Sequence, residues 1–319
     1  MQKMPELLLL RGGALRASVV PQIGGSLANF YSESDRADER HHWLRPASKA
    51  HLAQGNAFEM ASFPLVPWAN RIRDGRFTFD GREVQLPPNR GDDPHTIHGI
   101  GWMQAWEVSA RSESQIDLHM NYDGKGPWPY AFSSAQSYAL DPQGLSISLA
   151  VTNQGEVPMP AGIGHHPYFP HDTSGTGTRV TAQVQGIWES DATLLPQKLT
   201  HAHLVVDALN AGMRLGDFDL DNNFSGFDGL AQVDWPHGES LRMGASDSLN
   251  CFVVYCPQGR DIFCIEAVSN CTDWLNLRTP TEHAKGLGAL EQMAGGHVVL
   301  PGETLRGSLR LEPRVARAL

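Results

Sequence analysis

Apolar and polar residues alternate with a period of two along much of this chain. Residues 145–151 read Leu-Ser-Ile-Ser-Leu-Ala-Val, and residues 116–122 read Ile-Asp-Leu-His-Met-Asn-Tyr. Successive side chains of a β-strand point to opposite faces, so each segment predicts a strand with one buried face.

Turn signals separate these segments. Asp80-Gly81 lies between residues 77–79 and 84–86 and predicts a tight hairpin, because both positions tolerate positive φ. Residues 141–144 and Pro301-Gly302 predict two further turns. Few segments have a helical pattern, and one short helix is expected within residues 47–54, in a polar insertion that spans residues 35–54. Many short strands with frequent turns predict an all-β protein, one large antiparallel β-sandwich or barrel. No linker or repeat divides it, so we expect one domain over residues 1–319.

Composition narrows the classes of partner. The chain has 319 residues, 41% of them hydrophobic, and a net charge of −10. This charge argues against nucleic acid or an anionic membrane as partner, whereas small polar metabolites remain compatible with it. Residues 7–10 are too short an apolar run for a secretory leader, and no stretch reaches the length of a membrane span. The spacing of Cys251, Cys256, Cys264 and Cys271 matches no zinc or redox motif. We expect free, buried thiols and a cytoplasmic protein.

Three distant passages carry the candidate chemistry. They are residues 67–72 with 97–99, residues 164–169, and residues 263–266. Together they contain Arg71, His98, His166 and Glu266 within otherwise apolar segments. An acid, a base and hydrogen-bond donors are what proton transfer on a polar small molecule requires. No phosphate loop, metal motif or nucleophile elbow accompanies them, so we expect neither metal nor cofactor.

Each candidate also has a structural interpretation. His166 could simply pack and order a turn, and alternation would point His165 to the opposite face. Glu266 could lie at the exposed end of a strand, although burying its carboxyl group would require partners or a function. Arg71 could be an ordinary ion-paired arginine, His98 a structural histidine, and Asp221 a turn cap. A pyranose ring could stack on any of several tryptophans, although core packing is the default for each: Trp68, Trp102, Trp128, Trp188 and Trp274.

The order and spacing of these strings resemble the aldose 1-epimerase family, also called galactose mutarotases. The strings are Asn70-Arg71-Ile72, Ile97-His98-Gly99, His166-Pro-Tyr-Phe169, residues 221–224, Glu266 and Leu300-Pro-Gly-Glu303. The resemblance runs from about residue 20 to residue 311. It implies the large antiparallel β-supersandwich of that family, described as galactose mutarotase-like.

The resemblance also implies roles for individual residues. His166 would be the catalytic acid and Glu266 the catalytic base, while Arg71, His98 and Asp221 would contact the sugar. The expected reaction is interconversion of the α and β anomers of a free aldose. A Glu266 carboxylate would take the C1 hydroxyl proton, and a His166 imidazolium would protonate the ring oxygen.

Three alternatives stay open at this point. A hexose-6-phosphate 1-epimerase would need extra cations at the pocket rim, and Arg73, Arg76 and Arg90 are nearby in sequence. A non-catalytic sugar-binding protein could use the same fold. A glycoside hydrolase could pair Glu266 with Asp221, which would leave His166 without a role. The sequence leaves open which aldose is bound and whether the protein is a monomer or a homodimer.

Overall fold

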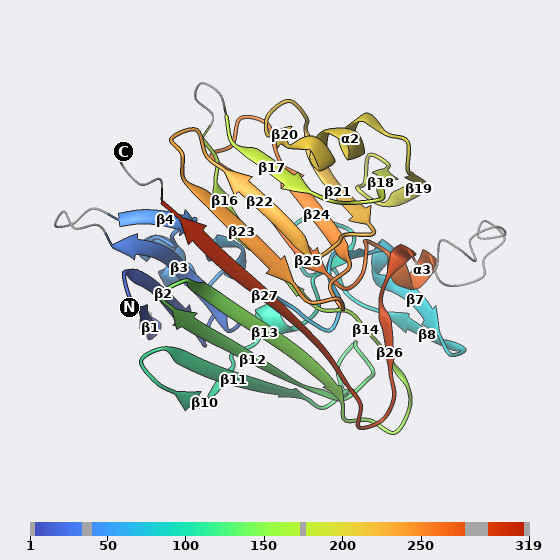
Figure 1. Ribbon diagram of the computed structural model, residues 1–319. Helices are drawn as coiled ribbons and strands as arrows, with labels where there is room; N and C mark the ends of the chain where they lie inside the picture. The colour runs from blue at the N-terminus through green and yellow to red at the C-terminus, as the bar shows by residue number, and fades with distance from the viewer. Residues whose placement is uncertain (1–3, 34–39, 173–176, 278–292, 316–319) are drawn as a thin grey trace.

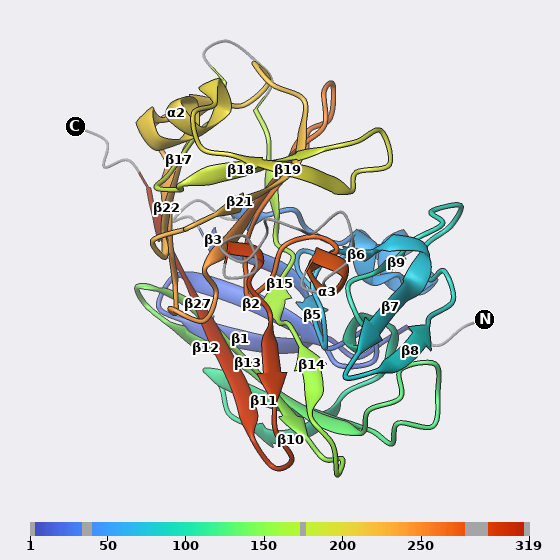
Figure 2. The same cartoon turned by 90° about the vertical axis from the view of Figure 1, so that its right-hand side faces the viewer.

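The computed structural model describes residues 4–33, 40–172, 177–277 and 293–315, so residues 35–39 of the insertion expected at 35–54 lie outside the described residues. Two large antiparallel sheets make up most of this structure (Figures 1 and 2). In spatial order, the nine-stranded sheet contains β10 (Glu107–Arg111), β11 (Gln115–Tyr122), β12 (Phe132–Asp141), β13 (Gly144–Asn153), β27 (Thr304–Arg314), β23 (Ser240–Ala245), β22 (Leu230–Asp234), β17 (Arg179–Ala182) and β20 (Met213–Arg214). The eight-stranded sheet contains β19 (Pro196–Thr200), β18 (Gly186–Ser190), β21 (Leu220–Ser225), β24 (Cys251–Cys256), β25 (Ile262–Val268), β15 (Gly164–His165) and β5 (Pro64–Leu65), with β16 (Tyr168–Pro170) also paired to β25.

Smaller elements surround these two sheets. A four-stranded sheet is formed by β1 (Leu8–Gly12), β2 (Leu15–Val20), β3 (Ser26–Glu33) and β4 (Arg40–Leu44). Three two-stranded pairs are β14 (Met159–Ala161) with β26 (His297–Val299), β6 (Arg71–Ile72) with β9 (Thr96–Ile97), and β7 (Arg76–Phe79) with β8 (Arg82–Gln85). The described helices are α1 (Lys49–Gln54), α2 (Leu204–Ala211), α3 (Trp274–Leu277) and the 3₁₀ turns Ala57–Glu59, Arg73–Gly75 and Gly101–Met103.

The predicted strands and the hairpin are confirmed. The alternating segments form β13 and β11, and β7 pairs with β8 through Asp80 and Gly81, which have φ values of 49° and 74°. The predicted short helix is α1, which Ser48 caps by accepting from the backbone N–H of His51. Helix α2 was not predicted, because its buried face consists of Val205, Val206 and Leu209, a pattern too short to read as helical. No helix among the described residues is long and apolar enough to cross a membrane.

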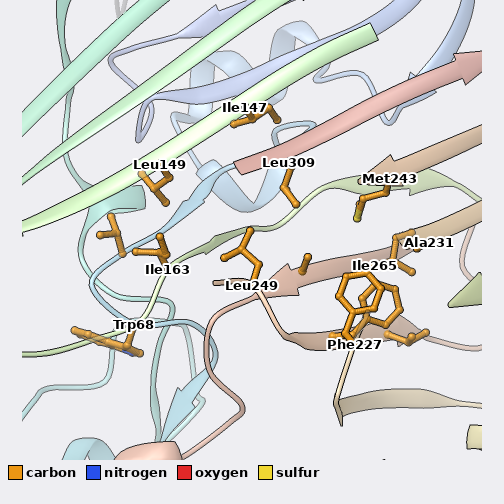
Figure 3. Close-up of a cluster of buried hydrophobic side chains, with 14 of the residues drawn as sticks. Trp68, Ile147, Leu149, Ile163, Phe227, Ala231, Met243, Leu249, Ile265 and Leu309 are labelled. Atoms are coloured by element: carbon orange, nitrogen blue, oxygen red, sulfur yellow. The ribbon is translucent and has the colours of Figure 1, made fainter. Parts of the chain in front are cut away.

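The main core fills the space between the two large sheets (Figure 3). Ile147 and Leu309 reach it from the nine-stranded sheet, and Ile265 reaches it from β25. All four cysteines are free and buried, as predicted. Burial of this apolar area stabilises the sandwich and fixes which face of each strand points inward.

The two faces of β25 have different surroundings, and this difference places the candidate site. Phe263, Ile265 and Ala267 belong to the main core, whereas Cys264 and Val268 belong to a second, smaller cluster. That second cluster also contains residues from β2, β3 and β5, so the N-terminal part of the chain covers this outer face of the eight-stranded sheet. Glu266 lies between Cys264 and Val268 in the alternation and therefore shares their face.

Candidate active site

A cavity of about 170 Å³ opens on the outer face of the eight-stranded sheet. Its size is below the ~300–1,000 Å³ typical for drug-sized ligands and suits a smaller polar molecule. All five residues singled out from the sequence line it. The full lining is Arg45, Phe58, Glu59, Asn70, Arg71, Arg90, Ile97, His98, His166, Tyr168, Asp221, Tyr255, Arg260, Ile262 and Glu266.

The register of the sheet brings His166 and Glu266 together. β25 pairs with β15 through Gly164 and Val268, and with β16 through Tyr168 and Cys264. Midway between these two pairs in an antiparallel ladder, His166 lies opposite Glu266. His166 Nε2 is 3.4 Å from Glu266 Oε1. His166 thus lies between the short strands β15 and β16, both of which pair with the strand that carries Glu266.

Aromatic rings hold the His166 imidazole in place. The rings of Phe63 and Tyr168 stack on it, with centroid distances of 4.9 Å and 4.6 Å. His165 points elsewhere: its Nδ1 is 3.4 Å from the hydroxyl of Ser62, and it does not line the cavity. The predicted opposite orientation of the two histidines is therefore observed, and only His166 reaches the site.

Arg71 is anchored by two carboxylates. Its Nε donates to Asp93 Oδ2 at 3.0 Å, and its Nη1 is 3.5 Å from Asp221 Oδ2. Asp93 is itself fixed, because its other oxygen accepts from the backbone N–H of His95. This clamp leaves the 7%-exposed Arg71 side chain in one orientation at the cavity wall.

His98 is held in a backbone conformation that few residues adopt. Asn70 and His98 have φ values of 59° and 61°, and the N–H of Asn70 donates to His98 Nδ1 at 3.1 Å. Because Nδ1 accepts this hydrogen bond, a neutral His98 carries its proton on Nε2 and can act as a donor there. The next residue, Gly99, has a φ of 73°.

Gly99→Ala is expected to destabilise the protein by about 3 kcal/mol or more, because the new Cβ would overlap the carbonyl oxygen of Val66 and the residue would keep a positive φ. Gly81→Ala is the matched control: Gly81 also has a positive φ, of 74°, but a Cβ there meets no atom within 4 Å. We expect it to cost only about 1 kcal/mol. Urea unfolding of both variants measures the difference, and equal losses would contradict the steric argument.

Burial shifts the acid–base equilibria of the facing pair. Burial, with help from the charges of Arg90 and Arg45, lowers the pKa of His166 to about 3. Burial and the charge of Asp221 raise the pKa of Glu266 well above its usual value. Both shifts disfavour the charged forms of the ligand-free pair, because a dry cavity disfavours separated charges.

The cavity lining also decides two points that the sequence left open, the role of the tryptophans and the position of the nearby arginines. None of the five tryptophans lines the cavity, and Phe58, Tyr168 and Tyr255 provide its aromatic surface instead. Of the three nearby arginines, only Arg90 lines it. Arg73 pairs with Asp273 and Arg76 bonds to Gln85, both away from the site.

Several lining or supporting residues had no sequence signal strong enough to identify them. Asp93 lies in a polar loop whose partner, Arg71, is 22 positions away. Arg45 and Arg260 are isolated in sequence, and Phe63 looks like ordinary core. Only Tyr168 could have been found, because it follows His166 by two positions and so shares its face. Within the described residues, no group of three His, Cys, Asp or Glu side chains is arranged to hold a metal ion.

Comparison with known proteins identifies the family. The family model for aldose 1-epimerase matches residues 6–307. The uncharacterized Escherichia coli protein YphB is 32% identical over 280 residues, which are 83% of this chain and 88% of YphB. Rat galactose mutarotase is 30% identical over 137 residues, 40% of this chain and 38% of that enzyme.

The fold agrees with these sequence matches. A crystal structure of a candidate aldose 1-epimerase from Escherichia coli K12 superposes with a TM-score of 0.82 at 28% identity, covering 98% of this chain and 99% of that one. The predicted galactose mutarotase-like β-supersandwich is thereby confirmed. From the family match over nearly its whole length, the chain belongs to the aldose 1-epimerase family.

Proposed function

We propose that this protein is an aldose 1-epimerase, which interconverts the α and β anomers of an aldose by opening and reclosing the ring. The observation that carries the proposal is the buried contact of His166 Nε2 with Glu266 Oε1, 3.4 Å apart in a cavity of monosaccharide size. An acid and a base at such a distance can act on two oxygens of one hemiacetal. The functional unit proposed is the single domain of residues 1–319, with a sugar as its partner.

The proposed reaction moves two protons and breaks one bond. The Glu266 carboxylate removes the proton of the C1 hydroxyl while the His166 imidazolium donates its proton to the ring oxygen. The bond between C1 and the ring oxygen breaks, and its electron pair stays on that oxygen. Rotation about C1–C2 presents the other face of the aldehyde. Closure reverses both proton transfers, so neither metal nor cofactor takes part in the proposed steps.

One internal proton transfer prepares the pair for this reaction. The ligand-free site favours the proton on Glu266, where burial raises the pKa. Across the 3.4 Å contact, this proton can pass to His166 Nε2 and produce the carboxylate–imidazolium form. Sugar hydroxyls that donate to Glu266 would stabilise its carboxylate, and its buried Oε2 has no hydrogen-bond partner among the described residues. Substrate binding thus favours the reactive form.

Three further side chains are proposed to hold the sugar. Arg71 presents the remaining guanidinium donors to ring hydroxyls, His98 donates through Nε2, and Asp221 accepts. Their positions are fixed by backbone and ion-pair contacts, so they can bind without rearrangement. Holding the hydroxyls that do not react leaves C1 free to rotate, which is the positional contribution to rate.

Anomerisation assays test the proposal directly. Pure α-anomers from a panel of aldoses are dissolved in the presence of the protein, and their approach to equilibrium is followed by polarimetry and by proton NMR. We expect a first-order rate that rises linearly with protein concentration for at least one sugar. Rates equal to buffer alone for every sugar would reject the proposal. Cleavage of an aryl glycoside would instead indicate a hydrolase.

A further inference from the structure

Positively charged side chains outnumber acidic ones around the cavity. Four lining residues are arginines: Arg45, Arg71, Arg90 and Arg260. Three lining residues are acidic, Glu59, Asp221 and Glu266, and burial favours the uncharged form of the last. The chain as a whole has a net charge of −10, so this local excess is opposite in sign to the rest of the protein.

One of the four arginines is already neutralised by carboxylates. Arg71 bonds to Asp93 at 3.0 Å and to Asp221 at 3.5 Å. Its charge is needed to hold these two carboxylates beside the site. The excess therefore comes from the other three arginines, which have no acidic partner within the described part of the chain.

These three guanidinium groups are held by other contacts or left open. Arg45 lies 3.9 Å over the Tyr168 ring and donates to the backbone carbonyls of Phe58 and Met60. Arg90 lies 4.6 Å over the Phe58 ring. Among the described residues, no hydrogen bond or ion pair engages the guanidinium of Arg90 or Arg260, and both side chains are exposed at the cavity mouth. The forked donors of both are thus available to a ligand.

The fields of these arginines overlap at the site. Burial raises the pKa of Tyr255, which lines the cavity, and the charges of Arg90 and Arg260 both oppose this rise. Arg90 and Arg45 both act on His166, where they disfavour the imidazolium. A bound anion beside them would offset this effect and favour a protonated His166, the form that donates to the ring oxygen.

We propose that the sugar acted on by this protein carries an oxyanion substituent, a carboxylate or a phosphate, which binds Arg90 and Arg260 while the anomeric carbon faces His166 and Glu266. Planar guanidinium groups form paired hydrogen bonds with both of these anions. A neutral sugar would cover the same cations without supplying an opposite charge. The proposal rests on the proposed anomerisation and specifies its substrate class.

The test compares sugars that share one ring. Kinetics are measured for glucose, glucose 6-phosphate and glucuronate, and binding of each is measured by calorimetry. We expect kcat/KM for at least one anionic sugar to exceed that for glucose by about tenfold or more, mainly through KM. Raising the ionic strength should reduce this preference, since salt screens exposed charges. The better of the two anionic sugars distinguishes phosphate from carboxylate.

Substitutions of single arginines test which residues cause the preference for an anionic sugar. Arg90→Gln and Arg260→Gln should each lower the ratio of kcat/KM for the anionic sugar to that for glucose by about tenfold. Arg76→Gln is the matched control, because Arg76 is exposed on β7, bonds to Gln85 and lies outside the cavity. It should leave both the ratio and the rate unchanged.

The outcomes separate this inference from the proposed function. If glucose is anomerised as well as its anionic counterparts and both variants match the wild type, the inference is overturned while the proposed function stands. If no sugar is anomerised but an anionic sugar binds and both variants weaken its binding, the anion site stands and the proposed reaction fails. If an anionic sugar neither reacts nor binds better than glucose, the inference is overturned.

Discussion

Glu266→Gln is expected to lower the rate of catalysed anomer interconversion by about 10²–10⁴-fold, the usual contribution of a general base. Glutamine has the same shape as a protonated glutamic acid but cannot accept the C1 hydroxyl proton. Because burial already favours the uncharged form of Glu266, we expect only a small change in the free energy of unfolding. The rate is measured by polarimetry with a freshly dissolved pure anomer, and stability by urea unfolding.

A surface variant controls for this substitution. Glu83→Gln makes the same chemical change at an exposed position on β8, outside the cavity, and should retain the wild-type rate. Wild-type activity in Glu266→Gln would remove Glu266 from the mechanism. If the variant loses activity and is also partly unfolded, its rate is divided by the fraction of folded molecules before it is compared with the wild-type rate.

His166→Asn is expected to reduce the rate by about 10²–10⁴-fold, the usual contribution of a general acid. Asparagine cannot donate a proton to the ring oxygen at neutral pH, and it loses the stacking of Phe63 and Tyr168 on the imidazole. The matched control is His165→Asn, at a neighbouring buried residue that faces away from the cavity. It should lower stability while the folded molecules keep their rate. Equal rate losses in the two variants would contradict a specific role for His166.

The pH profile of the wild type gives a second measurement on the same residue. Burial lowers the pKa of His166 from 6.5 to about 3 in the free enzyme. Activity requires the pair to hold one proton, and it is lost on the acid side when His166 takes up a second one. A lowered pKa moves this loss to lower pH, so kcat/KM should not decline as the pH falls from 7 through 6.5. An acid limb centred near 6.5 would show that the imidazole is not shifted.

Much of the fold could be predicted because its signals are local. The alternation in residues 116–122 and 145–151 specifies strands through adjacent side chains, and Asp80-Gly81 specifies its turn through its own backbone preferences. Helix α2 was missed for the converse reason. The apolar residues of this eight-residue helix can be recognised as one buried face only when the strands that they pack against are known.

The sequence could indicate which residues belong to the candidate site, because their side-chain types suit proton transfer. It could not indicate which residues those side chains contact. Nothing in the sequence joins Arg71 to Asp93, and tryptophans were as plausible as Phe58 or Tyr255 for the cavity wall. The cavity has no tryptophan, because Trp68, Trp128, Trp188 and Trp274 are buried in the core. Protonation was likewise beyond the sequence, since the pKa of His166 and of Glu266 depends on burial by distant segments.

The sequence by itself determined the strand pattern, the tight turns and the residue types available for proton transfer, because these follow from neighbours along the chain. Only the tertiary structure decided which of the two adjacent histidines lies opposite Glu266, and that three arginines with no acidic partner among the described residues line the same cavity. The reason is physical: these contacts depend on the register between strands about a hundred residues apart, which is fixed by burial of both sheet faces at once.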